Sequence, residues 1–588
     1  MKLSDYVWRF VSEYVAKHVF MFPGGGAMHL VDSLGNNKSL TYIPMLHEQA
    51  CAMAAETYAR MTYHTGVILV TTGPGGTNAI TGVAAAWLES TPLLVISGQA
   101  KTTDLKDGYG VRQRGNQEVG ITEIVSSITK YAVTVKHPED IRRHLEQAIY
   151  EANDGRKGPV WIDIPLDIQA AEIEAAKLKG FYQRGRVESV ENIRAQWSKQ
   201  IPKVISLLAE SKRPVIIAGQ GIERNRGREI FRRLVEYLRI PVLLSWMAVD
   251  LLEEEHPYNA GRPGMVAPRY SNKVMQESDL IIAVGTRLDP AMIGYNPKDF
   301  APGAKKVIVD IDLNEVNKFE FDVAEKVQAD ASEFLEAVFH QVQTSGYSGE
   351  QYSDWVNRLT RYKNEYPVVL PAYRRQEEKV NPYFFMETLF DELDDDDVIQ
   401  PGSSGNCIDF FYLCMKNKRY QRIICTGALG SMGYALPAAI GACIGSGHRT
   451  VCVEGDGSFQ LNIQELATIA GRRLPIKIFV VENGGYLSIM NMQRNHFTGH
   501  YVASNPKSGL YFGNIEKIAK AYGLHTISVS SHAQLKGAIR ETLEIEGPAI
   551  CVVHMMSDTS VQPKVMSYVG KDGSMVSGSL DNMWPPLA

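Results

Sequence analysis

Two apolar stretches in the last third of the chain are each followed closely by a polar side chain that carries oxygen. The stretch 450–453 leads into Gly455-Asp456-Gly457, and the stretch 476–481 leads into Asn483. The segment between them, IQELATIAGR, has the composition of a helix. In a strand–helix–strand unit both polar residues emerge at the same edge of a parallel sheet, where open α/β sheets bind ligands. The pattern therefore predicts a parallel α/β fold with a ligand site at this edge.

The residue types at this edge suit a divalent cation together with a phosphate group. Asp456, Asn483 and a nearby backbone carbonyl are hard oxygen ligands of the kind that bind Mg2+. The glycines that flank Asp456 allow the backbone to approach phosphates closely. A Gly-Asp-Gly turn also occurs as a plain strand-to-helix turn with a surface aspartate, so the motif alone leaves both interpretations open.

The spacing of Asp456 and Asn483 resembles the fingerprint of thiamine diphosphate (ThDP) enzymes. The resemblance implies that Asp456, Asn483 and the main-chain oxygen of Gly485 hold Mg2+. It also implies that Gly455, Gly457 and Ser458 lie against the cofactor. The usual signature ends in Asn-Asn, whereas this chain has Glu482-Asn483, so the contacts next to the metal ligand depart from the pattern.

Composition and charge narrow the classes of function. The chain has 588 residues, 45% hydrophobic and 22% charged, and this length predicts roughly three or four domains. The net charge of −5 gives no reason to expect nucleic acid or an anionic membrane as a partner. No window reaches the ~18 apolar residues of a membrane span, and the charged N-terminus lacks a signal-peptide core, which predicts a cytoplasmic protein. The dispersed cysteines predict reduced thiols, not a disulfide framework or a zinc site.

Short apolar runs alternate with amphipathic stretches in three blocks, which predicts three doubly wound parallel-sheet α/β domains. The blocks are 1–175, 191–345 and 376–556. The polar segments 176–190 and 346–375 are interpreted as linkers. Residues 557–588 show little periodicity and are expected to form a tail that orders over the site.

The run 47–99 resembles the pyrimidine-binding domain of the acetohydroxyacid synthases, also called acetolactate synthases. On its own, Glu48 is a helix N-terminal acid of the kind that the helix dipole favours. The resemblance implies that it protonates the aminopyrimidine ring of ThDP, and a buried carboxyl group suits proton exchange with a ring nitrogen.

Other positions of the first block receive roles from the same resemblance. Pro23 and Gly24 would border the cofactor. The glycine-rich turn 23–26 can also aim the N–H of Gly25 at a developing oxyanion, although a plain tight turn is an equal alternative. The segment 74–78, which ends at Asn78, is interpreted as a loop that opens a helix near the cofactor. Gln117 and Lys130 match active-site residues of the family, although surface ion pairs around this region are an equal alternative.

The second half of the cofactor site follows in the third block. The loop 426–433 resembles a family loop in which a carbonyl accepts from the cofactor's amino group and an apolar side chain supports its bent form, roles that fall on Gly430 and Met432. Gly402, Ser403 and Ser404 stand where the family has Gly-Gln-His-Gln and could bind the diphosphate. Because the family places ThDP between the first domain of one subunit and the third domain of another, the resemblance implies a homodimer or homotetramer.

The middle block resembles the family's domain for flavin adenine dinucleotide (FAD), and glycines at strand ends together with an arginine suit a pyrophosphate. Carboligation has no net redox step, so FAD would be structural. The positions that match its dinucleotide-contacting stretches are Gly219, Gln220, Gly221, Ser245, Trp246, Met265, Gly285, Arg287, Asp289, Asp310, Ile311 and Asp330.

The predicted function is a ThDP- and Mg2+-dependent carboligase that decarboxylates pyruvate and transfers its two-carbon unit to a ketone. The residues that choose the acceptor depart from the family, with Asn116 for Phe and Met492 for Trp. Together with local wording such as TKYAVT, this favours relatives that use nucleotide-linked ketosugars. Acetolactate synthase, a C–C hydrolase of cyclic diketones and a catalytically silent paralogue are the alternatives. Intact Glu48, Asp456 and Asn483 argue against the last.

Overall fold

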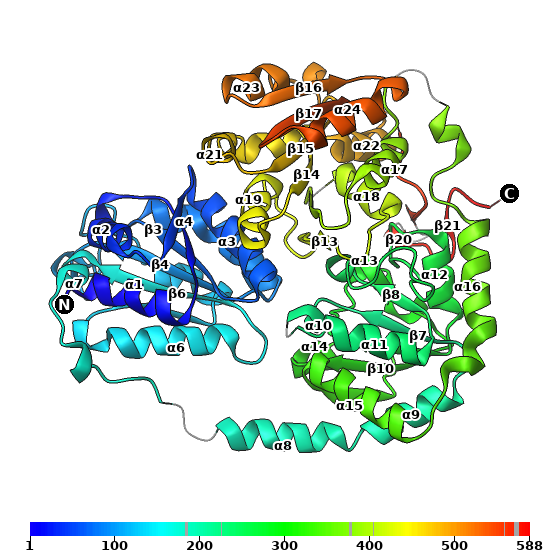
Figure 1. Cartoon of the computed structure of the whole chain (residues 1–588), viewed down its shortest axis with the longest axis horizontal. Coiled ribbons are helices and arrows are strands. Elements are labelled where there is room, and N and C mark those ends of the chain that lie inside the picture. The colour runs from blue at the N-terminus through cyan, green and yellow to red at the C-terminus, as the bar shows by residue number, and fades with distance from the viewer. Residues whose placement is uncertain are drawn as a thin grey trace.

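The computed structural model describes residues 1–182, 186–224, 226–375, 379–403, 405–557, 559–569 and 575–587. Three α/β domains follow one another along the chain, each built on its own parallel sheet (Figure 1). This confirms the fold class that the alternating pattern predicts. No helix in these ranges combines the length and the apolar composition needed to cross a bilayer.

The first domain contains a six-stranded parallel sheet in the order β2-β1-β3-β4-β6-β5. Its strands are β1 (His18–Met21), β2 (Thr41–Pro44), β3 (Gly66–Val70), β4 (Leu93–Gln99), β5 (Tyr131–Thr134) and β6 (Pro159–Pro165). Helices α1 (Leu3–Tyr14), α2 (Met28–Asn36) and α6 (Ile141–Asn153) pack on one face. Helices α3 (Glu48–Thr62) and α4 (Pro74–Leu88) pack on the other. Every residue of β3, β4 and β6 is buried, because helices cover both faces.

The second domain has a five-stranded parallel sheet in the order β11-β10-β9-β7-β8. The strands are β7 (Pro214–Ala218), β8 (Val242–Leu244), β9 (Leu280–Val284), β10 (Lys305–Asp310) and β11 (Glu325–Gln328). Helices α9 (Ile201–Glu210), α11 (Arg228–Leu238) and α15 (Ala331–Thr344) cover one face. Helices α12 (Arg269–Glu277) and α16 (Ser353–Glu365) contribute to the core on the other.

Helix α16 corrects the interpretation of 346–375 as a linker. Its residues Trp355, Leu359 and Tyr362 are buried in the core of the second domain. The segment is polar overall, but its apolar side chains recur at helical spacing and cover a sheet face. The other expected linker, 176–190, runs into helix α8 (Arg186–Ser198), and residues 183–185 lie outside the described ranges.

The third domain repeats the six-stranded arrangement in the order β13-β12-β14-β15-β17-β16. The strands are β12 (Val398–Pro401), β13 (Arg422–Ile423), β14 (Thr450–Gly455), β15 (Ile476–Glu482), β16 (His525–Val529) and β17 (Ala549–His554). Helices α17 (Pro382–Glu392), α18 (Gly405–Cys414) and α24 (His532–Glu544) contribute to the core on one face. Helices α19 (Ala435–Ser446), α21 (Glu465–Gly471) and α23 (Ile515–Ala521) contribute to the core on the other.

The first and third domains meet through α3 and α19, which lie against each other (Figure 1) and share one apolar core. Small residues allow this approach. A Cβ on Gly441 would lie 2.0 Å from the carbonyl oxygen of Ala54. The two helices are therefore packed backbone to backbone.

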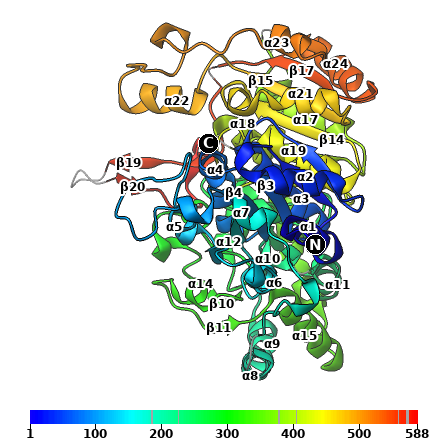
Figure 2. The same ribbon diagram turned by 90° about the vertical axis from the view of Figure 1, so that its left-hand side faces the viewer.

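The C-terminal segment contains short strands that its sequence pattern does not reveal. Strand β18 (Lys564–Val565) pairs with β21 (Met583–Trp584), and β19 (Ser567–Val569) pairs with β20 (Met575–Ser577) in a hairpin that projects from the body (Figure 2). The Val565 N–H donates to the Met265 carbonyl at 2.7 Å. The tail thus packs on the second domain, and its role as a cover for the site stays a prediction.

Candidate functional site

Asp456 lies at the carboxyl edge of the third sheet, where β14 ends and the short helix α20 (Asp456–Phe459) begins. One carboxylate oxygen, Oδ1, accepts from the Gly457 N–H at 2.8 Å. The other, Oδ2, accepts from the N–H groups of Asn483 and Gly484 at 3.1 and 2.9 Å. Burial raises the pKa of Asp456 to about 6, although these backbone donors lower it. The loop after β15 is therefore tied directly to the end of β14.

Asn483 follows β15 at the same edge, because β14 and β15 pair in parallel with Gly455 opposite Val481. Its side-chain Oδ1 is buried and has no hydrogen-bond partner among the described residues. Gly485 has a φ of +150°, and a Cβ there would lie 2.3 Å from the Ser504 carbonyl oxygen, so this turn needs glycine. An aspartate beside an unpaired amide oxygen is a donor set that fits Mg2+. The adjacency that parallel strands predict for Asp456 and Asn483 is present.

Glu482, the departure from the family signature, turns toward the neighbouring strand β17. Its Oε2 forms a hydrogen bond with His554 Nδ1. The other ring nitrogen of His554, Nε2, lies 3.3 Å from Glu516 Oε1 and 2.9 Å from Ser528 Oγ. Glu482 is thus hydrogen-bonded to a residue of β17 and not directed at Asp456. The side-chain oxygen of Asn483 remains as the amide oxygen that could bind a metal at this edge.

Three loops of the third domain lie side by side next to Asp456. Ser458 Oγ accepts from the Gly433 N–H at 2.8 Å, and Ser403 Oγ donates to the Ser431 carbonyl. Gly402 donates through its N–H to the Val453 carbonyl at 2.6 Å. Gly430 has a φ of +62°, which favours glycine. The predicted cofactor positions 402–403, 430–432 and 455–458 are therefore brought together, while Ser404 lies outside the described residues.

Glu48 is the first residue of α3 and is only 6% exposed. Asn78 on α4 donates through Nδ2 to Glu48 Oε2 at 3.0 Å. A Cβ on Gly75 would lie 3.6 Å from Glu48 Oε1, so the start of α4 borders the carboxylate. Glu48 and Asn78, which are predicted separately, thus form one hydrogen-bonded unit at the carboxyl edge of the first sheet.

The glycine turn after β1 lies at the same edge of the first sheet. Gly24 packs against Thr71, since a Cβ there would lie 2.5 Å from that side chain. Gly25 is different, because no atom of the described residues lies within 4 Å of the position that a Cβ would take. Pro23 and Gly25 are exposed. The backbone of Gly25 is therefore open to a ligand, as the sequence predicts, but no contact tests its role.

Gln117 and Lys130 lie in different places. Gln117 is exposed with a φ of +59°, a strained conformation of the kind that clusters at functional sites, and its carbonyl packs against Gly73 before α4. Lys130 precedes β5, at the amino edge of the sheet, and its Nζ donates to the Asp154 carbonyl. In the single chain Lys130 is not brought to the edge that carries Glu48, so its catalytic role stays a prediction.

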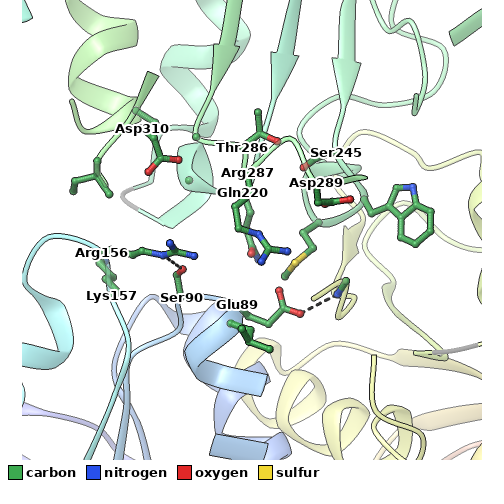
Figure 3. Close-up of a pocket in the computed structure, with 18 of the residues that line it drawn as sticks. Glu89, Ser90, Arg156, Lys157, Gln220, Ser245, Thr286, Arg287, Asp289 and Asp310 are labelled. Carbon is green, nitrogen blue, oxygen red and sulfur yellow. Dashed lines mark hydrogen bonds between the residues drawn. The ribbon is translucent and has the colours of Figure 1, made fainter. Parts of the chain in front are cut away.

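A cleft opens where the three domains meet, and it holds about 1120 Å3 of space that protein does not fill, part of it open to solvent (Figure 3). Second-domain residues form one side, and first-domain residues form the other. Among the predicted FAD positions the lining includes Gln220, Gly221, Ser245, Trp246, Gly285, Arg287, Asp289, Asp310, Ile311 and Asp330.

Two of the expected FAD positions lie elsewhere. Gly219 is not among the lining residues and packs against Gly285, which is, since a Cβ on Gly219 would lie 2.1 Å from the Gly285 carbonyl oxygen. Met265 is not among the lining residues and instead accepts from the tail through its carbonyl. Both differences arise because short strand-end motifs locate a loop but not the face that each residue presents.

The cleft offers groups of the kinds that bind a dinucleotide. Burial raises the pKa of Asp310, at the end of β10, to about 6. Arg287 forms no ion pair or hydrogen bond with any described residue. Between Arg287 and Asp289, Leu288 has a φ of +46°, and such strain clusters at ligand sites. An acidic strand end with an unengaged guanidinium fits a ribose and a pyrophosphate.

Sequence reasoning missed the first-domain side of this cleft. Figure 3 shows Glu89, Ser90, Arg156 and Lys157 facing the second-domain residues. Arg156 donates to Ser90 Oγ at 2.9 Å. No motif marks these four residues, because their position depends on how the domains dock.

Comparisons with known proteins match each of the three domains. Residues 1–124, 201–338 and 403–553 match the families described as thiamine pyrophosphate enzyme N-terminal TPP binding domain, central domain and C-terminal TPP binding domain. The acetolactate synthase large subunit of Corynebacterium glutamicum is 32% identical over 572 residues, 95% of this chain and 87% of that protein. The isozyme 1 large subunit of Escherichia coli is 30% identical over 566 residues, 96% of this chain and 95% of that protein. The chain therefore belongs to the thiamine diphosphate-dependent acetolactate synthase family of carboligases.

Proposed function

We propose that this enzyme decarboxylates pyruvate and joins the resulting two-carbon unit to a second 2-keto acid, with acetolactate as the product when that acid is pyruvate. The observation that carries the proposal is that Asp456 and the unsatisfied buried Oδ1 of Asn483 belong to neighbouring strand ends at one sheet edge, where the Asn483 N–H donates to Asp456. The names of the relatives, acetolactate synthase large subunits, support this acceptor.

Thiamine diphosphate, when bound, supplies an electron sink for decarboxylation. In the proposal Asp456, the side-chain oxygen of Asn483 and the carbonyl of Gly485 hold Mg2+. Gly402, Ser403 and the loop 430–433 seat the cofactor next to them. Glu48 holds a proton at the aminopyrimidine ring, and Asn78 keeps its carboxylate in place. Burial of Glu48 excludes water from this proton exchange.

The acceptor is the point on which the sequence-based expectation needs correction. The departures at Asn116 and Met492 favour a nucleotide-linked ketosugar, but the comparisons do not support that acceptor. Met492, on α22 (Leu487–His496), is 44% exposed in the single chain, so the contacts of the described residues do not test its effect on the acceptor. We therefore propose a 2-keto acid.

We further propose that the three-domain cleft binds FAD in a structural role. Its strand-end glycines, Arg287 and the buried Asp310 support this. Protein purified without added flavin should show a flavin absorbance band, and Arg287→Ala should reduce the flavin content. A colourless wild-type protein that also fails to take up added FAD would reject the proposal.

A homodimer is the smallest assembly that we propose. Large apolar side chains are exposed near the catalytic edges of both domains, among them Tyr42 and Leu46 in the first and Leu429 and Leu461 in the third. A partner that covers them would also complete each cofactor site, because the family resemblance places ThDP between the first domain of one subunit and the third domain of another. Sedimentation of dilute protein tests this, and a monomer that retains turnover would contradict it.

The test of function is incubation with labelled pyruvate, ThDP, Mg2+ and a panel of acceptors, with products identified by mass. We expect labelled CO2 and acetolactate, and a mixed product with 2-ketobutyrate. Asp456→Ala serves as the matched control and should release no CO2. A product formed preferentially with a nucleotide-linked ketosugar would overturn the proposed acceptor, and absence of CO2 from wild-type enzyme would overturn the whole proposal.

A further inference from the structure

Two buried glutamates cross the contact between the first and third domains in opposite directions. Glu89 follows α4 in the first domain and is 3% exposed. Its Oε1 accepts from the Thr426 hydroxyl at 2.7 Å and from the N–H groups of Gly427 and Ala428, each at 2.9 Å. Figure 3 shows Glu89 directed at this backbone. One carboxylate oxygen of the first domain thus holds three donors of the third.

Glu465 makes the reciprocal contact. It begins α21 in the third domain and is fully buried. Its Oε1 accepts from the Leu46 N–H of the first domain at 3.0 Å, and its Oε2 accepts from the Thr468 hydroxyl at 2.7 Å. Burial raises the pKa of Glu465, while these donors and the N–H of His47 lower it. The Glu465 carboxyl group therefore accepts a backbone hydrogen bond across the domain boundary.

Each glutamate holds the segment that leads into the predicted cofactor residues of the other domain. Residues 426–428 run into Gly430 and Met432, and residues 46–47 run into Glu48. Both segments lie outside helices and strands. Their N–H groups therefore need hydrogen-bond acceptors other than those that regular secondary structure provides. A carboxylate is a strong acceptor for such groups, and its hydrogen bonds are shorter and stronger than neutral ones.

Docking of the domains does not by itself require these contacts. The apolar packing of α3 on α19, with Gly441 against Ala54, already joins the two domains. A buried carboxylate is costly unless it is compensated, and hydrophobic residues would hold a plain interface at least as well. The two glutamates instead accept hydrogen bonds from backbone N–H groups next to the predicted cofactor residues. This indicates that they position the segments that carry those residues.

We propose that Glu89 and Glu465 are reciprocal positioning residues, each of which fixes the cofactor-bearing segment of the other ThDP domain. This inference rests on the proposed function for the meaning of the two segments, but the anchoring itself is a property of the apoprotein. In the dimer proposed above, these two segments of one chain serve different cofactor sites. The contacts of Glu89 and Glu465 would then link the two cofactor sites to which one chain contributes.

Amide hydrogen exchange of the apoprotein tests the anchoring directly. In Glu89→Leu we expect faster exchange in peptides that cover 426–433, with 45–50 and the helices α3 and α19 unchanged. In Glu465→Leu we expect faster exchange at 45–50 and no change at 426–433. Glu89→Gln keeps a carbonyl acceptor and should show a smaller effect, and Thr426→Val, which removes one donor, provides a milder variant if the leucine forms fail to fold. Glu13→Gln, exposed on α1, is the control.

Cofactor affinity supplies the second readout. Loss of a partner that orients a ligand-bearing group commonly costs about 10- to 100-fold in affinity, so Glu89→Leu should raise the Kd for ThDP with Mg2+ about tenfold or more, and Glu89→Gln less. Flavin content is measured alongside, because Glu89 also borders the cleft. Exchange that rises equally across α3 and α19, or that does not change in either segment, would overturn the proposal. Failure of the proposed function would appear separately, as wild-type enzyme without CO2 release but with the exchange pattern intact.

Discussion

Replacing Asn483 with leucine should stabilise the apoprotein while it removes most of the stabilisation that the cofactor provides. The side-chain Oδ1 of Asn483 is buried without a partner among the described residues, and leucine has a similar size. An unsatisfied buried polar atom costs about 1–3 kcal/mol, and replacing it with an apolar group removes that cost. We therefore expect Asn483→Leu to raise the free energy of unfolding of the apoprotein by about 1 kcal/mol.

With ThDP and Mg2+ bound, the wild-type enzyme should become more stable than Asn483→Leu. A ligand present at 100 times its Kd stabilises the folded state by about 2.7 kcal/mol. If loss of the Asn483 oxygen weakens binding about 100-fold, the same concentration stabilises the variant by only about 0.4 kcal/mol. With the gain of about 1 kcal/mol in the apoprotein, the variant ends about 1.3 kcal/mol below the wild-type enzyme.

Thermal unfolding with and without ThDP and Mg2+ measures both effects. Asn417→Leu is the matched control, because Asn417 also has a buried unpaired Oδ1 but lies before β13, away from Asp456. Its response to cofactor should equal that of the wild-type enzyme. An Asn483→Leu variant that is destabilised as apoprotein and still responds fully to ThDP with Mg2+ would refute the assignment of Asn483 as a metal ligand.

Three further outcomes are expected. Asn78→Ala removes a hydrogen bond to the Glu48 side chain worth about 0.5–1.5 kcal/mol, so kcat at saturating ThDP should fall about 2- to 10-fold, and an unchanged kcat would contradict the pairing. Gly441→Ala should lower stability by about 1–3 kcal/mol in thermal unfolding, because its Cβ would lie 2.0 Å from a carbonyl oxygen of α3, whereas Gly471→Ala, with open space around it, should not. Burial raises the pKa of Asp163 from 3.8 to about 7, so its carboxyl binds protons more tightly when folded. Stability relative to Asp163→Asn should therefore fall by up to ~4 kcal/mol as pH rises from about 4 to 7, and a difference that does not depend on pH would contradict this.

The sheets and the metal edge could be predicted because both depend on local pattern. Strands that are buried on both faces, such as β3 and β4, read as continuous apolar runs, and parallel pairing brings their carboxyl ends together. The adjacency of Asp456 and Asn483 follows from that geometry alone. Glu48 and Asn78 are each predicted near the cofactor through the family resemblance, and their hydrogen bond is a finding of the structure.

Features that depend on how the domains dock could not be predicted. Arg156 and Lys157 reach the cleft, and Glu89 and Glu465 reach the opposite ThDP domain, through contacts between residues far apart in the chain. Lys130 matches a family residue by local wording, but in the single chain it lies at the amino edge of its sheet. Short strands such as those of the tail carry too few residues for a periodic signal.

Exchange of the C2 proton of ThDP for deuterium tests the central claim most directly, because it reports activation of the cofactor before any substrate binds. The wild-type enzyme with Mg2+ should exchange this proton far faster than free ThDP. Glu48→Gln should slow the exchange by about 10²- to 10⁴-fold, the usual contribution of a positioned proton donor or acceptor. Equal exchange rates in the two proteins would contradict the role assigned to Glu48.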